Sequence, residues 1–161
     1  MIDSRTGVSY DALSKRINKK LRDAIKILKE LGYKSQRVSL KEFYDYMTGE
    51  TPTGDAITIV DVLGNDFLII HEIVEISELK KMGIPIHRRT IMTFHPKVYE
   101  AHYTAIEYEL NYALDKKDYE WLKVRINHAK SWLEDDYLPQ HLVPRCKAII
   151  KRFSEVLLKE E

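Results

Sequence analysis

The sequence is poor in several features that mark large classes of protein. Cys146 is its one cysteine, which excludes an internal disulfide and suits a reducing, cytoplasmic compartment. The formal net charge is only +1, which argues against a strongly basic nucleic-acid binder. Four asparagines and two glutamines stand against many lysines, glutamates and isoleucines, a composition that favours a thermophilic source.

Long apolar runs are also missing, so we expect no membrane-spanning segment. The longest apolar region, 56–70, is interrupted by Asp61, Gly64, Asn65 and Asp66. The opening residues Met1–Arg5 have no apolar core, so we expect no signal peptide. The remaining composition, 44% hydrophobic and 32% charged, is that of an ordinary globular protein, and 161 residues are enough for one domain with a substantial core.

The hydrophobic periodicity predicts a mainly α-helical fold, a single domain over 1–161 of about six helices with one or two short strands. Apolar spacing and capping residues predict helices over 9–31, 39–47, 66–83, 96–114, 118–133 and 144–159. The alternating, β-branched residues 56–62 predict a strand, and 89–93 predict a second one.

The helix expected over 66–83 carries ionisable residues in an apolar setting. It is apolar on almost every side, yet it contains His71, Glu72 and Glu75. Burying such groups costs free energy unless they are paired, hydrogen-bonded or bound to a metal. On a helical wheel His71, Glu75 and Glu78 share one stripe, and Glu72 lies one step round from it. We therefore expect this stripe to face a cleft, a partner or an ion.

The helix expected over 96–114 repeats this pattern, with His102 and Glu109 two turns apart within its apolar stripe. Imidazole and carboxylate are ligands that zinc, iron and manganese accept. We therefore predict a divalent metal site, with zinc as the first choice. Its ligands would be His71, Glu75 and His102, with Glu109 or Glu78 in support, and Glu72 would handle the proton of a metal-bound water.

The segment His71-Glu72-Ile73-Val74-Glu75 resembles the zincin metallopeptidase helix, whose signature is His-Glu-x-x-His. The resemblance implies that His71 is the first metal ligand, that Glu72 is the general base, and that Glu75 replaces the second histidine. It also implies a third ligand from a following helix, for which His102, Glu109 and the looser candidate His95 are available. The resemblance covers about 56–114 and implies a hydrolase of a peptide or another small molecule.

The same residues also fit other functions. The His and Glu residues could form a buried hydrogen-bond network in a structural or interaction protein, or line a cleft for an organic ligand. The Glu-x-x-Glu spacing of Glu72 and Glu75, or of Glu75 and Glu78, is also found in helical nucleotide pyrophosphohydrolases that bind magnesium. The first helix is basic and could contact the phosphates of a nucleic acid. Its cations are Lys15, Arg16, Lys19, Lys20, Arg22, Lys26 and Lys29.

The helix expected over 118–133 has an inner side marked by Trp121, His128 and Trp132. We interpret these three residues as core, because large aromatic side chains at helical spacing usually pack inside.

Overall fold

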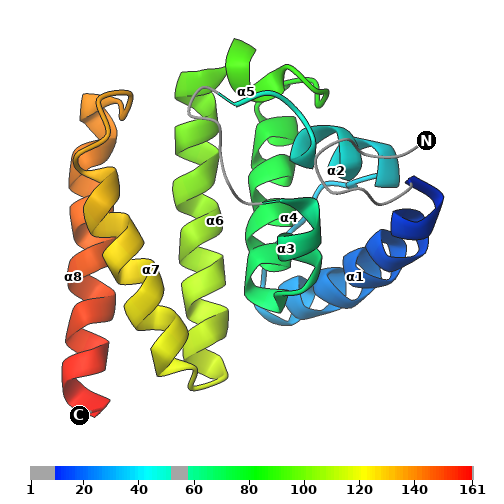
Figure 1. The fold of residues 1–161 in the computed structure, drawn as a ribbon. Coiled ribbons are helices and arrows are strands. Elements are labelled where there is room, and N and C mark those ends of the chain that lie inside the picture. Colours follow the sequence, from blue (N-terminus) through cyan, green and yellow to red (C-terminus); the bar gives the residue numbers. More distant parts are fainter. Residues whose placement is uncertain (1–9, 52–57, 161) are drawn as a thin grey trace.

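The computed structural model describes residues 10–51 and 58–160, and all the regular structure in these ranges is helical (Figure 1). The prediction of a mainly α-helical protein is therefore confirmed, and all six predicted helices are present. The helices are α1 (Tyr10–Glu30), α2 (Leu40–Met47), α3 (Ile59–Leu63), α4 (Asp66–Lys81), α5 (Thr90–Thr93), α6 (His95–Asp115), α7 (Tyr119–Trp132), the 3-10 turn η1 (Gln140–Leu142) and α8 (Val143–Glu160).

The predictions of strands are wrong for the described part of the chain. Residues 56 and 57 of the first predicted strand lie outside the described residues, and Ile59–Leu63 form α3. The Thr58 side chain accepts a hydrogen bond from the Asp61 amide, and the Asp61 side chain accepts one from the Thr58 amide. This capping box satisfies backbone groups locally and outweighs the β preference of the sequence. The second predicted strand, over 89–93, is also wrong, because Thr90–Thr93 form α5. A strand here would need a neighbouring strand for its backbone hydrogen bonds, and none is present within the described ranges.

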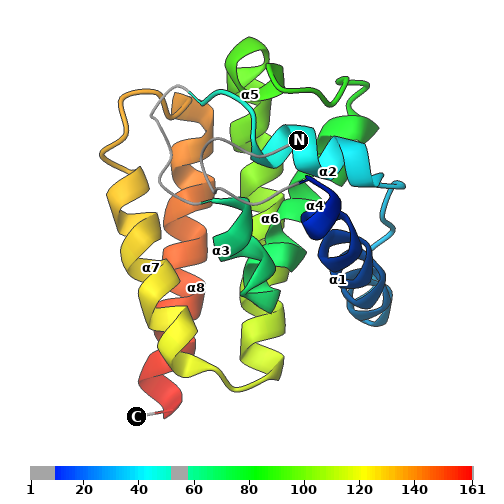
Figure 2. The same ribbon diagram turned by 45° about the vertical axis from the view of Figure 1, so that its right-hand side comes forward.

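Two apolar cores lie on either side of α6 (Figures 1 and 2). One core is built mainly from α1 to α4, and α6 contributes Ala101 and Ala105 to it. The other is built mainly from α7 and α8, and α6 contributes Ile106 and Leu110 to it. The most extensive helix pairing in the described chain is that of α6 with α4. Groups between α4 and α6 are therefore largely buried: His71 is 3% and Glu109 0% exposed, although the His102 side chain keeps 24% of its surface exposed.

Helix α4 is buried on almost every side, as its sequence predicts. Its buried residues are Ile69, Ile70, His71, Ile73, Val74, Glu75, Ile76, Ser77 and Leu79. The Asn65 side chain caps its first turn by accepting from the Leu68 amide at 3.1 Å. Neither α4 nor any other described helix combines the length and the apolarity that crossing a membrane requires.

The burial of α4 can be tested with a matched pair of isoleucines. Ile70 on α4 is fully buried, whereas Ile25 on α1 is 38% exposed. We expect Ile70→Ala to lower the free energy of unfolding by about 2–5 kcal/mol, because it removes buried methyl groups and leaves a cavity. Ile25→Ala should change it by about 0.5 kcal/mol or less. Chemical denaturation measures both, and equal losses would contradict this placement of α4.

Candidate metal centre

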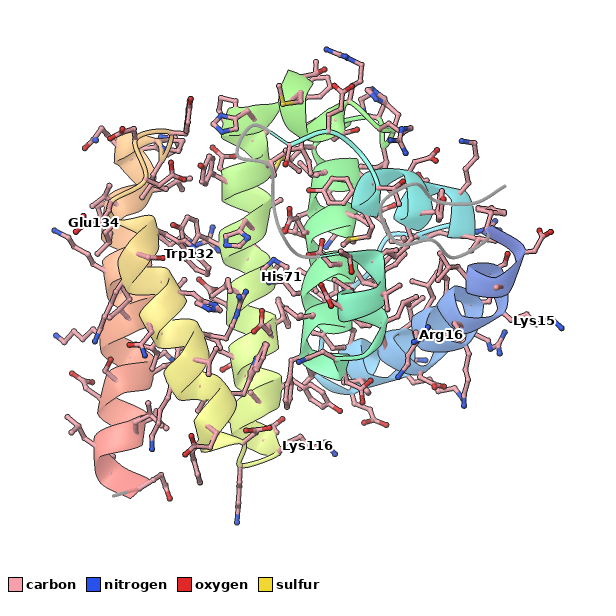
Figure 3. All side chains as sticks on the ribbon, in the orientation of Figure 1. Lys15, Arg16, His71, Lys116, Trp132 and Glu134 are labelled. Carbon is pink, nitrogen blue, oxygen red and sulfur yellow. The ribbon has the colours of Figure 1, made fainter. Side chains whose placement is uncertain are left out.

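Three side chains converge where α4 packs against α6. His71 and Glu75 lie one turn apart on α4, and His102 approaches them from α6; Figure 3 shows His71 between the two helices. His71 Nε2 is 2.9 Å from Glu75 Oε2 and 3.1 Å from His102 Nδ1. The third side of this triangle, from His102 Nδ1 to Glu75 Oε2, is 3.5 Å. The structure thus brings together the three residues predicted as metal ligands.

The triangle has the size that a shared metal ion requires. Ligand atoms about 2.1 Å from one ion stand about 3.0 Å apart at octahedral angles and about 3.4 Å apart at tetrahedral angles. The observed separations of 2.9, 3.1 and 3.5 Å cover this range. Two imidazoles and one carboxylate on one face of an ion leave its other positions open. Such sets are typical of catalytic zinc and of non-haem iron.

Glu109, fully buried on α6, fixes the orientation of His71. Its Oε1 accepts a hydrogen bond from His71 Nδ1–H at 2.9 Å. Arg125 donates to both of its oxygens, at 2.8 and 3.1 Å, and Trp121 Nε1 donates to Oε2 at 2.7 Å. Burial acts to raise the pKa of Glu109, but Arg125 and His71 hold it below its ordinary value. An ionised Glu109 therefore keeps the proton on Nδ1 and turns Nε2 toward Glu75 and His102.

Tyr46 of α2 orients Glu75 in the same way. Its hydroxyl donates to Glu75 Oε1 at 2.5 Å, so that Oε2 is the oxygen that meets the two histidines. Burial raises the pKa of Tyr46 well above its ordinary value, which keeps this hydroxyl a donor. Burial also acts to raise the pKa of Glu75, but its contacts with His102 and His71 bring it well below the ordinary range.

The centre of the triangle needs a shared proton or a metal ion. If neither His71 Nε2 nor His102 Nδ1 carried a proton, three lone pairs would face one another within 3.5 Å. A proton on Nε2 is one solution: burial acts to lower the pKa of His71, but hydrogen bonds to Glu109 and Glu75 raise it to about 10. Burial lowers the pKa of His102, so this ring is neutral: its Nδ1 accepts from His71 when its proton is on Nε2, and donates when its proton is on Nδ1. A metal ion that replaces the shared proton is the other solution.

The three residues line a cavity of about 380 Å³. Its other walls come from α2, α5, α6 and α7, and combine apolar side chains with a few polar ones. Trp132, which Figure 3 shows at the end of α7, packs edge-on against the His102 ring with 4.7 Å between ring centroids. A mixed cavity of this size can hold a water and a small molecule beside the triangle.

Two further predicted site residues, Glu72 and His95, line this cavity without joining the triangle. The charge of Glu72 helps to raise the pKa of both Tyr46 and His71, which places its carboxylate close to them. The His95 ring packs edge-on against Tyr99, with ring centroids 4.9 Å apart. His95 and Glu72 therefore belong to the wall of the cavity.

Glu78, predicted as a supporting residue, lies elsewhere. It accepts a hydrogen bond from the Tyr33 hydroxyl at 2.7 Å and pairs with Lys81 at 3.0 Å. Seven residues along a helix correspond to about 10 Å, so Glu78 shares the stripe of His71 but not its position along the axis.

Sequence reasoning missed the contribution of α7. Trp121 and Trp132 are only partly buried, and Trp121 donates to Glu109. The interpretation of His128 as core is wrong: it is exposed, it lines the cavity, and its Nδ1 accepts from Arg125 Nη1 at 3.1 Å. Residues 121, 125, 128 and 132 share one stripe of α7. An arginine between two tryptophans on such a stripe was the signal for a buried anion nearby.

Comparison with known proteins adds no precedent for this arrangement. No protein-family model, no curated protein and no solved structure matches the chain. The chemistry of the cluster is therefore inferred from its ligand types, distances and charges.

Proposed function

We propose that this protein binds a divalent metal ion through His71 Nε2, Glu75 Oε2 and His102 Nδ1, and that the ion activates water for the hydrolysis of a small substrate. The observation that carries this proposal is the convergence of these three atoms within 3.5 Å, beside a cavity. Zinc is the first choice, because it accepts two histidines and one carboxylate in catalytic sites and keeps a fourth position for water.

The charges around the triangle support a dication. Glu72, Glu75 and Glu109 supply three negative charges, and Arg125 supplies one positive charge. A proton on His71 leaves this group at −1, whereas a divalent ion bound to neutral His71 brings it to zero. Because uncompensated charge is costly among buried side chains, a divalent ion neutralises this group more completely than a proton does.

Glu72 is the candidate general base. It follows His71 directly, as in the zincin helix that the sequence resembles, and it lines the cavity next to the proposed ligands. A zinc ion held by His71, Glu75 and His102 would supply an acidified water, and the Glu72 carboxylate would take its proton and return it to the leaving group. A peptide or another small molecule with a hydrolysable bond is the substrate class that this chemistry serves.

A non-catalytic hydrogen-bond network is the second candidate, and one observation favours it. A protonated His71 can donate to Glu109 from Nδ1 and to Glu75 from Nε2, so the described contacts are satisfied without an ion. In that case the cluster would specify how α4 packs on α6, as buried polar groups do in some proteins.

Elemental analysis of untagged protein separates the two candidates. We expect close to one zinc or iron ion per chain in the wild type and its loss in His71→Ala, because two ligands alone hold an ion weakly. The matched control is His141→Ala, since His141 is exposed and pairs with Glu100 away from the triangle. A wild type that takes up no zinc, iron or manganese after incubation with each would overturn the metal site.

A further inference from the structure

Positive charge is concentrated on one helix at the edge of the molecule. Residues 10–37, which comprise α1 and the loop after it, hold nine lysines and arginines against three acidic residues, a balance of +6. The whole chain carries +1, so its other residues together carry −5. Helix α1 contacts α2, α3 and α4 along one side only, and Figures 1 and 2 show it at the periphery. The molecule is therefore electrically polarised, with α1 as its positive end.

Five of these cations form a straight line, which we call the α1 basic stripe. They are Lys15, Lys19, Arg22, Lys26 and Lys29. Their alternating spacing of four and three residues keeps them on one face of the helix, over a length of about 21 Å. All five are exposed, and none forms an ion pair with an acidic side chain in the described ranges. Figure 3 shows Lys15 at the outer side of α1, away from the neighbouring helices.

The opposite face of α1 is already occupied. Its apolar residues Leu13, Ile17, Leu21, Ala24 and Leu28 are buried in the core that α1 shares with α4. An amphipathic helix that lies in a lipid surface inserts its apolar face between the lipids. Because the apolar face of α1 is packed inside the protein, the helix can offer a partner only its row of charges.

We propose that the α1 basic stripe binds the phosphate backbone of a nucleic acid. Successive cations of the stripe lie about 5 Å apart along the helix axis, which suits a polymer with closely and regularly spaced negative charges. Lysine and arginine contacts to phosphate position a protein on a nucleic acid without reading its bases. The acidic remainder of the chain keeps this contact on α1, because it repels the same backbone elsewhere.

Anisotropy titrations of a labelled duplex of about 20 base pairs, in EDTA over about 50 to 300 mM KCl, test this proposal. Contacts to five phosphates predict that log K falls with log salt with a slope of about −4.5. The triple variant Lys19→Gln, Arg22→Gln, Lys26→Gln should reduce this slope to about −2, because three of the five contacts are lost. Glutamine keeps nearly the helix propensity of lysine and arginine, so α1 should remain folded.

The matched control removes the same charge from the other end of the molecule. Lys130, Lys147 and Lys151 on α7 and α8 are also exposed, and Lys130→Gln, Lys147→Gln, Lys151→Gln should leave the slope nearly unchanged. An equal reduction of the slope in the two triple variants would show that binding depends only on the net charge of the protein. That result would overturn the α1 basic stripe as a binding site. A single strand of the same length that binds with a slope of about −3.5 also supports the proposal.

Three further results would overturn it. They are failure to bind either nucleic acid at the lowest salt, binding only to vesicles that contain phosphatidylserine, and salt-sensitive self-association in sedimentation without binding to nucleic acid. Because EDTA is present throughout, the outcome is independent of the proposed metal site.

Discussion

Replacing Glu109 with alanine should lower the free energy of unfolding of the metal-free protein by about 3–5 kcal/mol at neutral pH. Glu109 is fully buried and accepts hydrogen bonds from Arg125, Trp121 and His71. Its removal leaves the guanidinium of Arg125, which is only 5% exposed, without its carboxylate in a site shielded from water. Removing one partner of a buried ion pair is costly because the other charge remains desolvated. Urea denaturation in EDTA measures the loss.

The double variant Glu109→Leu, Arg125→Met is the matched control. It removes both charges and keeps most of the side-chain volume, so most of the lost stability should return. Metal affinity should nevertheless fall by about 10 to 100-fold, because His71 loses the carboxylate that orients it. A loss below about 1 kcal/mol in Glu109→Ala would contradict the buried pair. Unchanged metal affinity in the double variant would show that Glu109 does not orient His71.

The part of the site that lies on single helices could be predicted from the sequence. His71 and Glu75 are one turn apart, and a helix with apolar residues on almost every side has to be buried. The same reasoning placed His102 and Glu109 on the inner face of α6. The structure adds that these two faces meet, at 2.9 Å between His71 Nδ1 and Glu109 Oε1. Periodicity cannot give that distance, because it describes one helix at a time.

The residues that complete the site come from elements that are distant in the sequence. Tyr46 reaches Glu75 from α2, and Arg125 reaches Glu109 from α7. Tyrosine is common on the surfaces of helices, so nothing in the local sequence of Tyr46 indicates its contact. For Arg125 the only local signal is its place between Trp121 and Trp132 on one stripe of α7. The strand predicted over 56–62 failed for the opposite reason. The β propensity of these residues was visible in the sequence, but the capping box between Thr58 and Asp61 makes residues Ile59–Leu63 helical.

The position of the cluster explains why its protonation and the stability of the fold are coupled. It lies between two apolar cores, where the charged forms of Glu75 and Glu109 persist because each is hydrogen-bonded. Burial acts to raise the pKa of both carboxyls, but these hydrogen bonds and the nearby positive charges lower it below the ordinary value. Their contribution to stability is therefore present above the ordinary value of 4.5 and is lost as the pH falls through the lowered values.

His71 should make the stability of the metal-free protein decrease as the pH rises, which is the opposite of the effect of the two carboxyls. Its pKa rises from 6.5 to about 10 on folding, because the hydrogen bonds to Glu109 and Glu75 outweigh burial. The folded state therefore holds this proton more tightly than the unfolded chain does. The resulting stability is fully present below pH 6.5 and is lost as the pH rises through 10. Denaturation of the metal-free protein along this range should show the decline, and His71→Ala should remove it.

Metal affinity should rise over the same range in which the metal-free protein loses stability. An ion can bind His71 Nε2 only after that nitrogen loses its proton, so affinity should increase about tenfold per pH unit below pH 10. Zinc titrations by calorimetry, in two buffers of different ionisation enthalpy, should detect the release of close to one proton near neutral pH. Affinity that is independent of pH between 7 and 9, with no proton released, would show that His71 is already neutral. In that case the triangle of Glu75, His71 and His102 would have no proton on His71 Nε2 for the ion to replace. Protonation of His71 and metal binding would then not compete for that nitrogen.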